Sequence, residues 1–189
     1  MRAERAQFAL VGGLAVSAWA EPRLTRDADL AVAVNSDSEA EELVRRLLRR
    51  GYQVGALVEQ ERLGRLATAR LVDASGSGLY VDLLFASSGV EPELVSSAVE
   101  IELTADLVAP VATVGFLIAL KLLSRDDRAR PNDADDLASL RVVATDADWD
   151  EATIAVNLIV GRGYHRDRDL ASGLQVLRSS GAYGHTPGE

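Results

Sequence analysis

The sequence has no cysteine, and only two of its 189 residues are histidines, His165 and His185. The missing thiols exclude disulfide bonds, cysteine-ligated zinc and thiol catalysis. Both histidines come late in the chain, and His185 stands among glycine and proline, so we do not expect a histidine-based zinc site. Zinc and thiol chemistry are therefore set aside.

Long hydrophobic runs are lacking as well. The longest one after the N-terminal segment, residues 111–120, is too short to cross a bilayer. The N-terminal apolar run is interrupted by Glu21 and Arg23 and lacks the cleavage site of a signal peptide. Hydrophobic residues still make up 48% of the chain, enough for one compact domain or a core with a short helical appendage. We expect a cytoplasmic protein with no membrane association.

Lysine is nearly absent, since Lys121 is the only lysine among 20 basic residues. It interrupts an apolar run, residues 116–123, where an ammonium group needs a partner such as a phosphate or a carboxylate. The alternative is a lysine at a helix edge that extends its ammonium into water.

Positive charge is in deficit overall, because the formal net charge is −9 and the isoelectric point is about 4.8. This balance argues against a protein whose whole surface binds nucleic acid. One segment does gather arginines, namely Arg45, Arg46, Arg49 and Arg50. That segment begins with Glu39, Glu41 and Glu42, and acids before bases complement a helix dipole. We therefore favour a solvated helix face over a basic groove.

The hydrophobic pattern predicts an α/β protein of the α+β kind, a mixed sheet flanked by helices with a helical C-terminal part. The expected strands cover residues 8–11, 23–34, 52–58, 66–72, 79–85 and 99–103. The expected helices cover residues 14–20, 38–50, 92–97, 113–123, 133–143, 148–160 and 167–178. We expect an α/β core over 1–108, a helical part packed on it over 109–180, and a flexible tail over 181–189.

Two acids on one predicted strand are the first candidate for chemistry. On an extended strand, alternate side chains project to the same side, which groups Arg23, Thr25, Asp27 and Asp29. Two carboxylates this close repel each other and favour a shared divalent cation. Hard oxygen ligands suit Mg2+, which takes further ligands from substrate phosphates. An Asp-x-Asp pair is also common in turns and caps, so this pattern alone is weak.

Two further features strengthen it. Asp82 interrupts an apolar strand, an expensive place for a charge unless it is paired or metal-bound; an edge-strand residue facing water is the alternative. Gly12 and Gly13 follow a predicted strand and precede a helix, where a glycine turn lets phosphate approach the backbone and the helix N-terminus.

These motifs together resemble the opening of the minimal nucleotidyltransferases of the DNA-polymerase-β-like superfamily. The pattern is Phe-Ala-Leu-Val-Gly-Gly-Leu-Ala from Phe8, followed by Arg-x-Thr-x-Asp-x-Asp-Leu from Arg23. More narrowly, the chain is similar to the AbiEii/AbiGii toxin branch, which includes the MenT toxins. Residues 110–121 resemble that branch's lysine-bearing helix, and residues 132–140 resemble a later Lys-Asp-x-x-Asp-Leu segment. The similarity extends over residues 8–140.

The resemblance implies a nucleotidyltransferase fold and an NTP- and Mg2+-dependent transfer of a nucleotide, with Mn2+ as a possible substitute. It implies metal ligation by Asp27, Asp29 and Asp82, and catalytic roles for these acids and for Lys121. It also implies nucleotide binding by a further set of residues: Gly12, Gly13, Arg23, Thr25, Lys121 and Asp136. Asn132 stands where the family has lysine, so Asp133 and Asp136 remain open between this motif and a helix N-terminal acid cluster.

Three functions follow as alternatives. The first is the toxin of a toxin–antitoxin pair, which transfers a nucleotide to RNA, with the tRNA acceptor end as a candidate and an antitoxin protein as partner. The second is the same chemistry on a protein or small-molecule hydroxyl. The third is a catalytically inactive nucleotide-binding or interaction module, against which the set of three acids argues.

Overall fold

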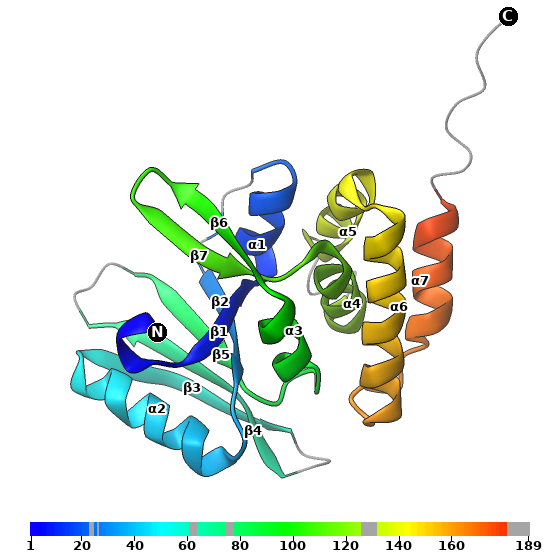
Figure 1. The fold of residues 1–189 in the computed structure, drawn as a ribbon. Coiled ribbons are helices and arrows are strands. Elements are labelled where there is room, and N and C mark those ends of the chain that lie inside the picture. The colour runs from blue at the N-terminus through cyan, green and yellow to red at the C-terminus, as the bar shows by residue number, and fades with distance from the viewer. Residues whose placement is uncertain (23–24, 26, 61–63, 75–77, 126–131, 181–189) are drawn as a thin grey trace, which may run out of the picture.

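A seven-stranded mixed sheet with helices around it forms the protein (Figure 1). The computed structural model describes residues 1–22, 25, 27–60, 64–74, 78–125 and 132–180. The strands are β1 (Gln7–Val11), β2 (Asp27–Ala33), β3 (Tyr52–Gln60), β4 (Arg65–Asp73), β5 (Tyr80–Leu84), β6 (Val99–Thr104) and β7 (Leu107–Val111). Their order in the sheet is β3-β4-β5-β2-β1-β7-β6.

The helices begin with a 3-10 turn, η1 (Arg2–Glu4). They continue as α1 (Gly12–Trp19), α2 (Asp37–Arg49), α3 (Glu91–Ser97), α4 (Val114–Ser124), α5 (Asn132–Val143), α6 (Asp146–Gly161) and α7 (Leu170–Ser179). The last four gather beside the sheet (Figure 1). No helix in the described part of the chain is both long and apolar enough to span a membrane.

Helix α2 covers one face of the sheet because its apolar stripe meets every second residue of the strands. Leu43 and Leu47 of α2 are buried in one cluster with Leu71 of β4 and Leu83 of β5. The Ser36 side chain caps the helix by accepting a hydrogen bond from the Glu39 amide. The neighbouring residues of β4 and β5 therefore point to the opposite face of the sheet.

That opposite face shares its core with the C-terminal helices. Val11 and Ala31 of the sheet belong to the same buried cluster as Leu117 of α4 and Ile159 of α6. Strand β7 also crosses residue 108, where we expected the α/β core to end. The division into two parts stays a prediction, and the proposed tail, 181–189, lies outside the described residues.

The arrangement confirms the predicted fold class, but strand β7 was not expected. Pro110 lies inside it and pairs in register with Glu100 of β6. Because proline has no amide hydrogen to donate, it is typical of edges and breaks rather than of strand interiors. Nothing in the sequence around Pro110 indicates that a strand accepts a proline at this position.

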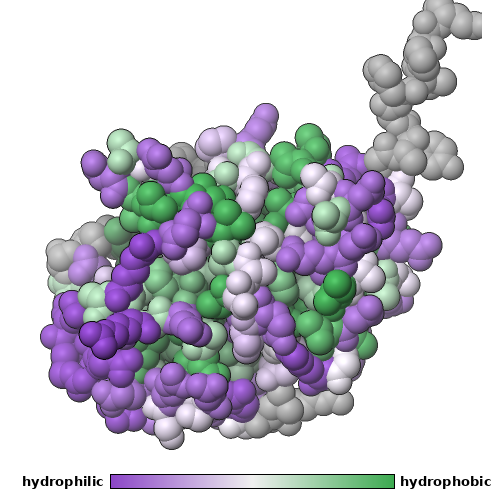
Figure 2. Space-filling view, in the orientation of Figure 1, coloured by the Kyte–Doolittle hydropathy of each residue, from purple (hydrophilic) through white to green (hydrophobic). Residues whose placement is uncertain are grey.

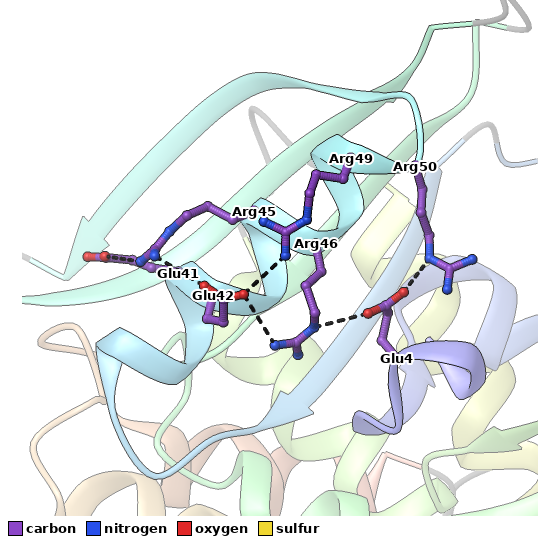
Figure 3. Close-up of polar contacts among 7 residues, drawn as sticks. All are labelled: Glu4, Glu41, Glu42, Arg45, Arg46, Arg49 and Arg50. Carbon is purple, nitrogen blue, oxygen red and sulfur yellow. Dashed lines mark hydrogen bonds and ion pairs between the residues drawn. The ribbon is translucent and has the colours of Figure 1, made fainter.

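The arginine cluster lies on the outer side of α2 and at its end, as a solvated face. Figure 3 shows its four arginines paired with three acids, Glu4, Glu41 and Glu42. Arg45 is 3.1 Å from both Glu41 and Glu42, and Arg46 is 3.0 Å from Glu4. In Figure 2 this region is strongly hydrophilic, whereas hydrophobic residues gather over the β6–β7 hairpin. The arginines are thus engaged within the protein.

Candidate functional site

A row of polar side chains crosses the sheet on the face opposite α2. Arg70 of β4 pairs in register with Asp82 of β5, and Asp82 pairs in turn with Asp29 of β2. Asp29 is the partner of Val11, the last residue of β1. Residues that pair in register project to the same face of a sheet, so the two predicted acids are direct neighbours.

The turn after β1 closes against Asp29. Gly12 has a φ of +65°, a backbone conformation that favours glycine. A Cβ atom on this residue would lie only 1.9 Å from Asp29 Oδ2. Helix α1 starts directly at this turn, so the carboxylate lies beside the first turn of a helix.

Arg70 holds the third acid through both of its oxygens. Its Nε donates to Asp82 Oδ1 at 2.8 Å and its Nη2 donates to Oδ2 at 2.6 Å. This hydrogen bond raises the pKa of Arg70 above its usual range, and the charges of Asp82, Asp27 and Asp29 raise it further against the opposing effect of burial. One guanidinium therefore experiences the field of all three predicted metal ligands.

Arg70 and the residues in register with it, Asp82 and Asp29, line a cavity of about 770 Å3 between the sheet and the C-terminal helices. Its walls include Gly12, Asp29 and Asp82, and on the helical side Lys121 and Ser124 of α4. A volume of this size is typical of small-molecule sites, which fall at roughly 300–1,000 Å3. The cavity therefore joins the two motifs that the sequence places almost a hundred residues apart.

Lys121 is buried and bonded to two acids of α5. Its Nζ lies 2.7 Å from Asp133 Oδ1 and 2.7 Å from Asp136 Oδ2. The Ser124 hydroxyl donates to the other oxygen of Asp133 at 2.9 Å. The side chains of Lys121 and Asp136 are 10% and 1% exposed, so this group is an internal ion cluster at the cavity wall.

The loop after β5 forms another part of the wall and is tied to the end of the helical part. Ser87 and Ser88 line the cavity, and their amides both donate to Glu91 Oε1. Burial raises the pKa of the Glu91 carboxyl, against the hydrogen bonds it accepts. Arg166, which follows α6 in the chain, donates to the Ser87 carbonyl at 3.0 Å and also lines the cavity. The hydrogen bond from Arg166 therefore ties the loop after β5 to the segment between α6 and α7.

The other predicted site residues lie nearby with different surroundings. Asp27 begins β2, two residues before Asp29, and the Thr25 hydroxyl donates to its carbonyl at 3.4 Å. Gly13 is buried in the first turn of α1. Of the described residues, neither these three nor Asp136 are among those that line the cavity, and Arg23 lies outside the described residues. Their roles stay predictions.

Sequence reasoning missed Arg70 and Arg166. Arg70 gave the same signal as Asp82, a charge inside an apolar strand, and only the β4–β5 register makes the two into a pair. Arg166 follows α6 in a short connection and is positioned by tertiary packing. No sequence pattern would have placed it at this cavity.

The three carboxylates fit a divalent cation in chemistry, since hard oxygen donors suit Mg2+. Asp29 and Asp82 pair in register on one face of the sheet, and Asp27 lies two residues before Asp29 on β2. Within the described ranges, no three histidine, cysteine, aspartate or glutamate side chains are grouped closely enough to hold a metal ion. Both oxygens of Asp82 are bonded to Arg70 instead.

Comparison with known protein families identifies the family of this chain. The family model of the nucleotidyl transferase AbiEii toxin, from type IV toxin–antitoxin systems, matches residues 2–179. The chain belongs to the AbiEii nucleotidyltransferase family. This confirms the resemblance inferred from the glycine turn and the Asp-x-Asp strand. No curated protein sequence matches this AbiEii-family chain.

Three solved structures are similar to this AbiEii-family chain. An antigenic nucleotidyltransferase-like protein from Paracoccidioides brasiliensis is 18% identical, with a TM-score of 0.50 over 92% of this chain and 86% of that one. The antibiotic-resistance factor ANT(2'')-Ia is 16% identical, with a TM-score of 0.46 over 96% and 84% of the two chains. The lincosamide antibiotic adenylyltransferase LnuA is 13% identical, with a TM-score of 0.46 over 76% and 90%.

Proposed function

We propose that this protein is an NTP- and Mg2+-dependent nucleotidyltransferase that acts as the toxin of a toxin–antitoxin pair and transfers a nucleotide to RNA. The observation that supports it is the pairing of Asp29 with Asp82 at a cavity bordered by the Gly12 turn and by Lys121. The family match over residues 2–179 gives this pairing its chemical meaning. The tRNA acceptor end is the candidate acceptor, and an antitoxin protein is the expected partner.

Asp27, Asp29 and Asp82 are the residues that would hold Mg2+. When bound, such ions neutralise the triphosphate and stabilise the attacking and leaving oxygens of an in-line displacement. Because Gly12 has no side chain, the Asp29 carboxylate can lie against this turn beside the start of α1, where a helix N-terminus favours phosphate. We assign Thr25, Gly13 and Arg23 to the same phosphate-binding edge.

Lys121 contributes a positive charge at the opposite wall of the cavity. An ammonium has three N–H donors, and two of them are directed to Asp133 and Asp136. The third can serve a phosphate oxygen without breaking either ion pair. In this assignment Asp136 acts on the nucleotide through Lys121, as a residue that positions the ammonium.

The proposal is tested by incubating the purified protein with each labelled NTP, Mg2+ and total RNA. Asp29→Asn should abolish label transfer, because it removes a carboxylate from the centre of the row. Asp135→Asn is the matched control, since Asp135 is an exposed acid on α5. Label on RNA with parent and control alone supports the proposal. Label on a protein or on a small molecule would contradict RNA as the acceptor. No label with any NTP would favour an inactive binding module.

A further inference from the structure

Arg70 occupies the place where a cation would contact Asp82. Its guanidinium meets the carboxylate through two parallel hydrogen bonds of 2.8 and 2.6 Å, the geometry of the strongest arginine–carboxylate pairs. Each oxygen keeps a further lone pair, but the positive charge of the guanidinium beside both oxygens disfavours a second cation there. Arg70 and a divalent cation therefore compete for the same two oxygens.

The competition extends beyond Asp82. Arg70, Asp82 and Asp29 stand in register on three neighbouring strands, on one face of the sheet. Asp27, two residues along β2, projects to the same side. The charges of all three acids act on Arg70. A fixed positive charge thus offsets the repulsion that would otherwise draw in a metal ion.

We propose that Arg70 is an internal counter-ion, which holds the metal-binding carboxylates in the substrate-free protein and gives up Asp82 to the divalent cation that arrives with nucleotide. The inference rests on the proposed function in taking these carboxylates as metal ligands. It assigns Arg70 a positioning role and makes the protein a weak binder of free metal.

The surroundings of Arg70 allow this exchange. Its side chain is 43% exposed, whereas that of Asp82 is 13% exposed, so the guanidinium can swing toward water while the acid stays in place. The Tyr80 ring on β5 lies beneath Arg70 with its centroid 5.5 Å from Cζ, a contact that supports the guanidinium without using Asp82. Arg70 also lines the cavity, where a guanidinium released from Asp82 meets the phosphates of a bound nucleotide.

The test measures binding of Mn2+ alone, by calorimetric titration and by the electron paramagnetic resonance of the free ion, without nucleotide. Arg70→Gln should bind Mn2+ more tightly than the parent, on the order of tenfold, because a charge beside the ion is removed. Arg45→Gln is the matched control: it makes the same change in net charge on α2, which covers the opposite face of the sheet. It should bind as the parent does.

Arg70→Lys keeps the positive charge but loses the bidentate hydrogen bond to Asp82. Its affinity for Mn2+ should therefore lie between those of the parent and Arg70→Gln. This variant retains a positive group beside Asp82 and serves as the test if Arg70→Gln melts below the assay temperature. Equal Mn2+ affinity in parent and Arg70 variants, or no Mn2+ binding by any of them, overturns the proposal. A parent that labels RNA while Arg70→Gln gains no affinity leaves the enzyme proposal intact and removes this one. Tighter Mn2+ binding by Arg70→Gln with no label transfer by the parent supports this proposal and removes the enzyme proposal.

Discussion

The backbone of Gly12 is pressed against the carboxylate of Asp29, with room for a hydrogen but none for a methyl group. A Cβ on residue 12 would stand 1.9 Å from Oδ2, 2.7 Å from Cγ and 2.9 Å from the Cβ of Asp29. The glycine turn and the acid are therefore one structural unit, and the position of either depends on the other.

Gly12→Ala should displace Asp29 and abolish nucleotide transfer. It should also destabilise the fold by more than the ~1–2 kcal/mol that a left-handed backbone costs a residue with a side chain. Gly64→Ala is the matched control, because Gly64 has a φ of +59° and nothing within 4 Å of an added Cβ. Chemical denaturation and label transfer measure both effects. Equal losses of stability and equal activity in the two variants would contradict the prediction.

Lys121→Met should destabilise the protein by about 3–5 kcal/mol, because it leaves Asp133 and Asp136 buried without their cation. Denaturant titration of parent and variant gives the difference in free energy of unfolding.

A compensated variant separates folding from activity at this cluster. Lys121→Met combined with Asp133→Asn and Asp136→Asn removes the uncompensated charges, so it should be more stable than Lys121→Met alone. It should still fail to transfer nucleotide, since the ammonium is gone. Recovery of activity along with stability would rule out a phosphate-binding role for Lys121.

Stability should fall with rising pH because of Glu91. Burial raises the pKa of this carboxyl in the folded protein, so the folded state holds a proton that the unfolded chain releases. The stabilisation is complete below the ordinary carboxyl pKa and is lost as pH rises through the raised folded value. Glu91→Gln keeps an oxygen that accepts from Ser87 and Ser88, and should gain stability relative to the parent as pH increases.

Glu93→Gln, on the same helix, is the control with the opposite sign. The hydrogen bond from Arg162 lowers the pKa of Glu93, so its contribution is present above the ordinary carboxyl pKa and is lost as pH falls. Denaturation curves from about pH 2 to pH 8 should show the two variants diverging in opposite directions from the parent, Glu93→Gln at the acid end and Glu91→Gln at higher pH. Parallel pH profiles would contradict the assignment of Glu91.

The Asp27→Asn, Asp29→Asn double variant should lose the thermal stabilisation that Mg2+ with NTP gives the parent. Ligand that binds only the folded state raises stability with the logarithm of its concentration, and this variant lacks two of the three carboxylates. Without ligand it should melt no lower than the parent, because carboxylate repulsion is reduced. Melting curves with and without Mg2+ and each NTP, beside Asp135→Asn, provide the measurement.

Local pattern was sufficient for most elements and for the central pair of acids. Alternation along the strand put Asp27 and Asp29 on one side, and the charge of Asp82 inside an apolar segment marked it as a partner for them. These features depend on neighbours in sequence, and a single chain carries that information. The predicted class of nucleotidyltransferase followed from the resemblance of the motifs around Gly12, Asp27 and Asp29 to a known family.

The pairing of residues on neighbouring strands could not be predicted in the same way. The register that sets Arg70 beside Asp82 depends on the β4–β5 hairpin, whose strands slip by two residues without changing which face is apolar. The bonds of Lys121 to α5 depend on how two helices pack. In both cases a lone charge in an apolar segment was visible in the sequence, but its partner was not.

The solitary lysine has a practical consequence for protein chemistry. Lys121 is the one lysine in the whole chain, and it is engaged in a buried ion cluster. Acylating reagents therefore meet a single reactive amine on the intact fold, that of the N-terminus. Any acylation detected at Lys121 records moments when its ammonium leaves Asp133 and Asp136, so a mass spectrometer can follow the opening of this ion cluster with no probe engineered into the protein.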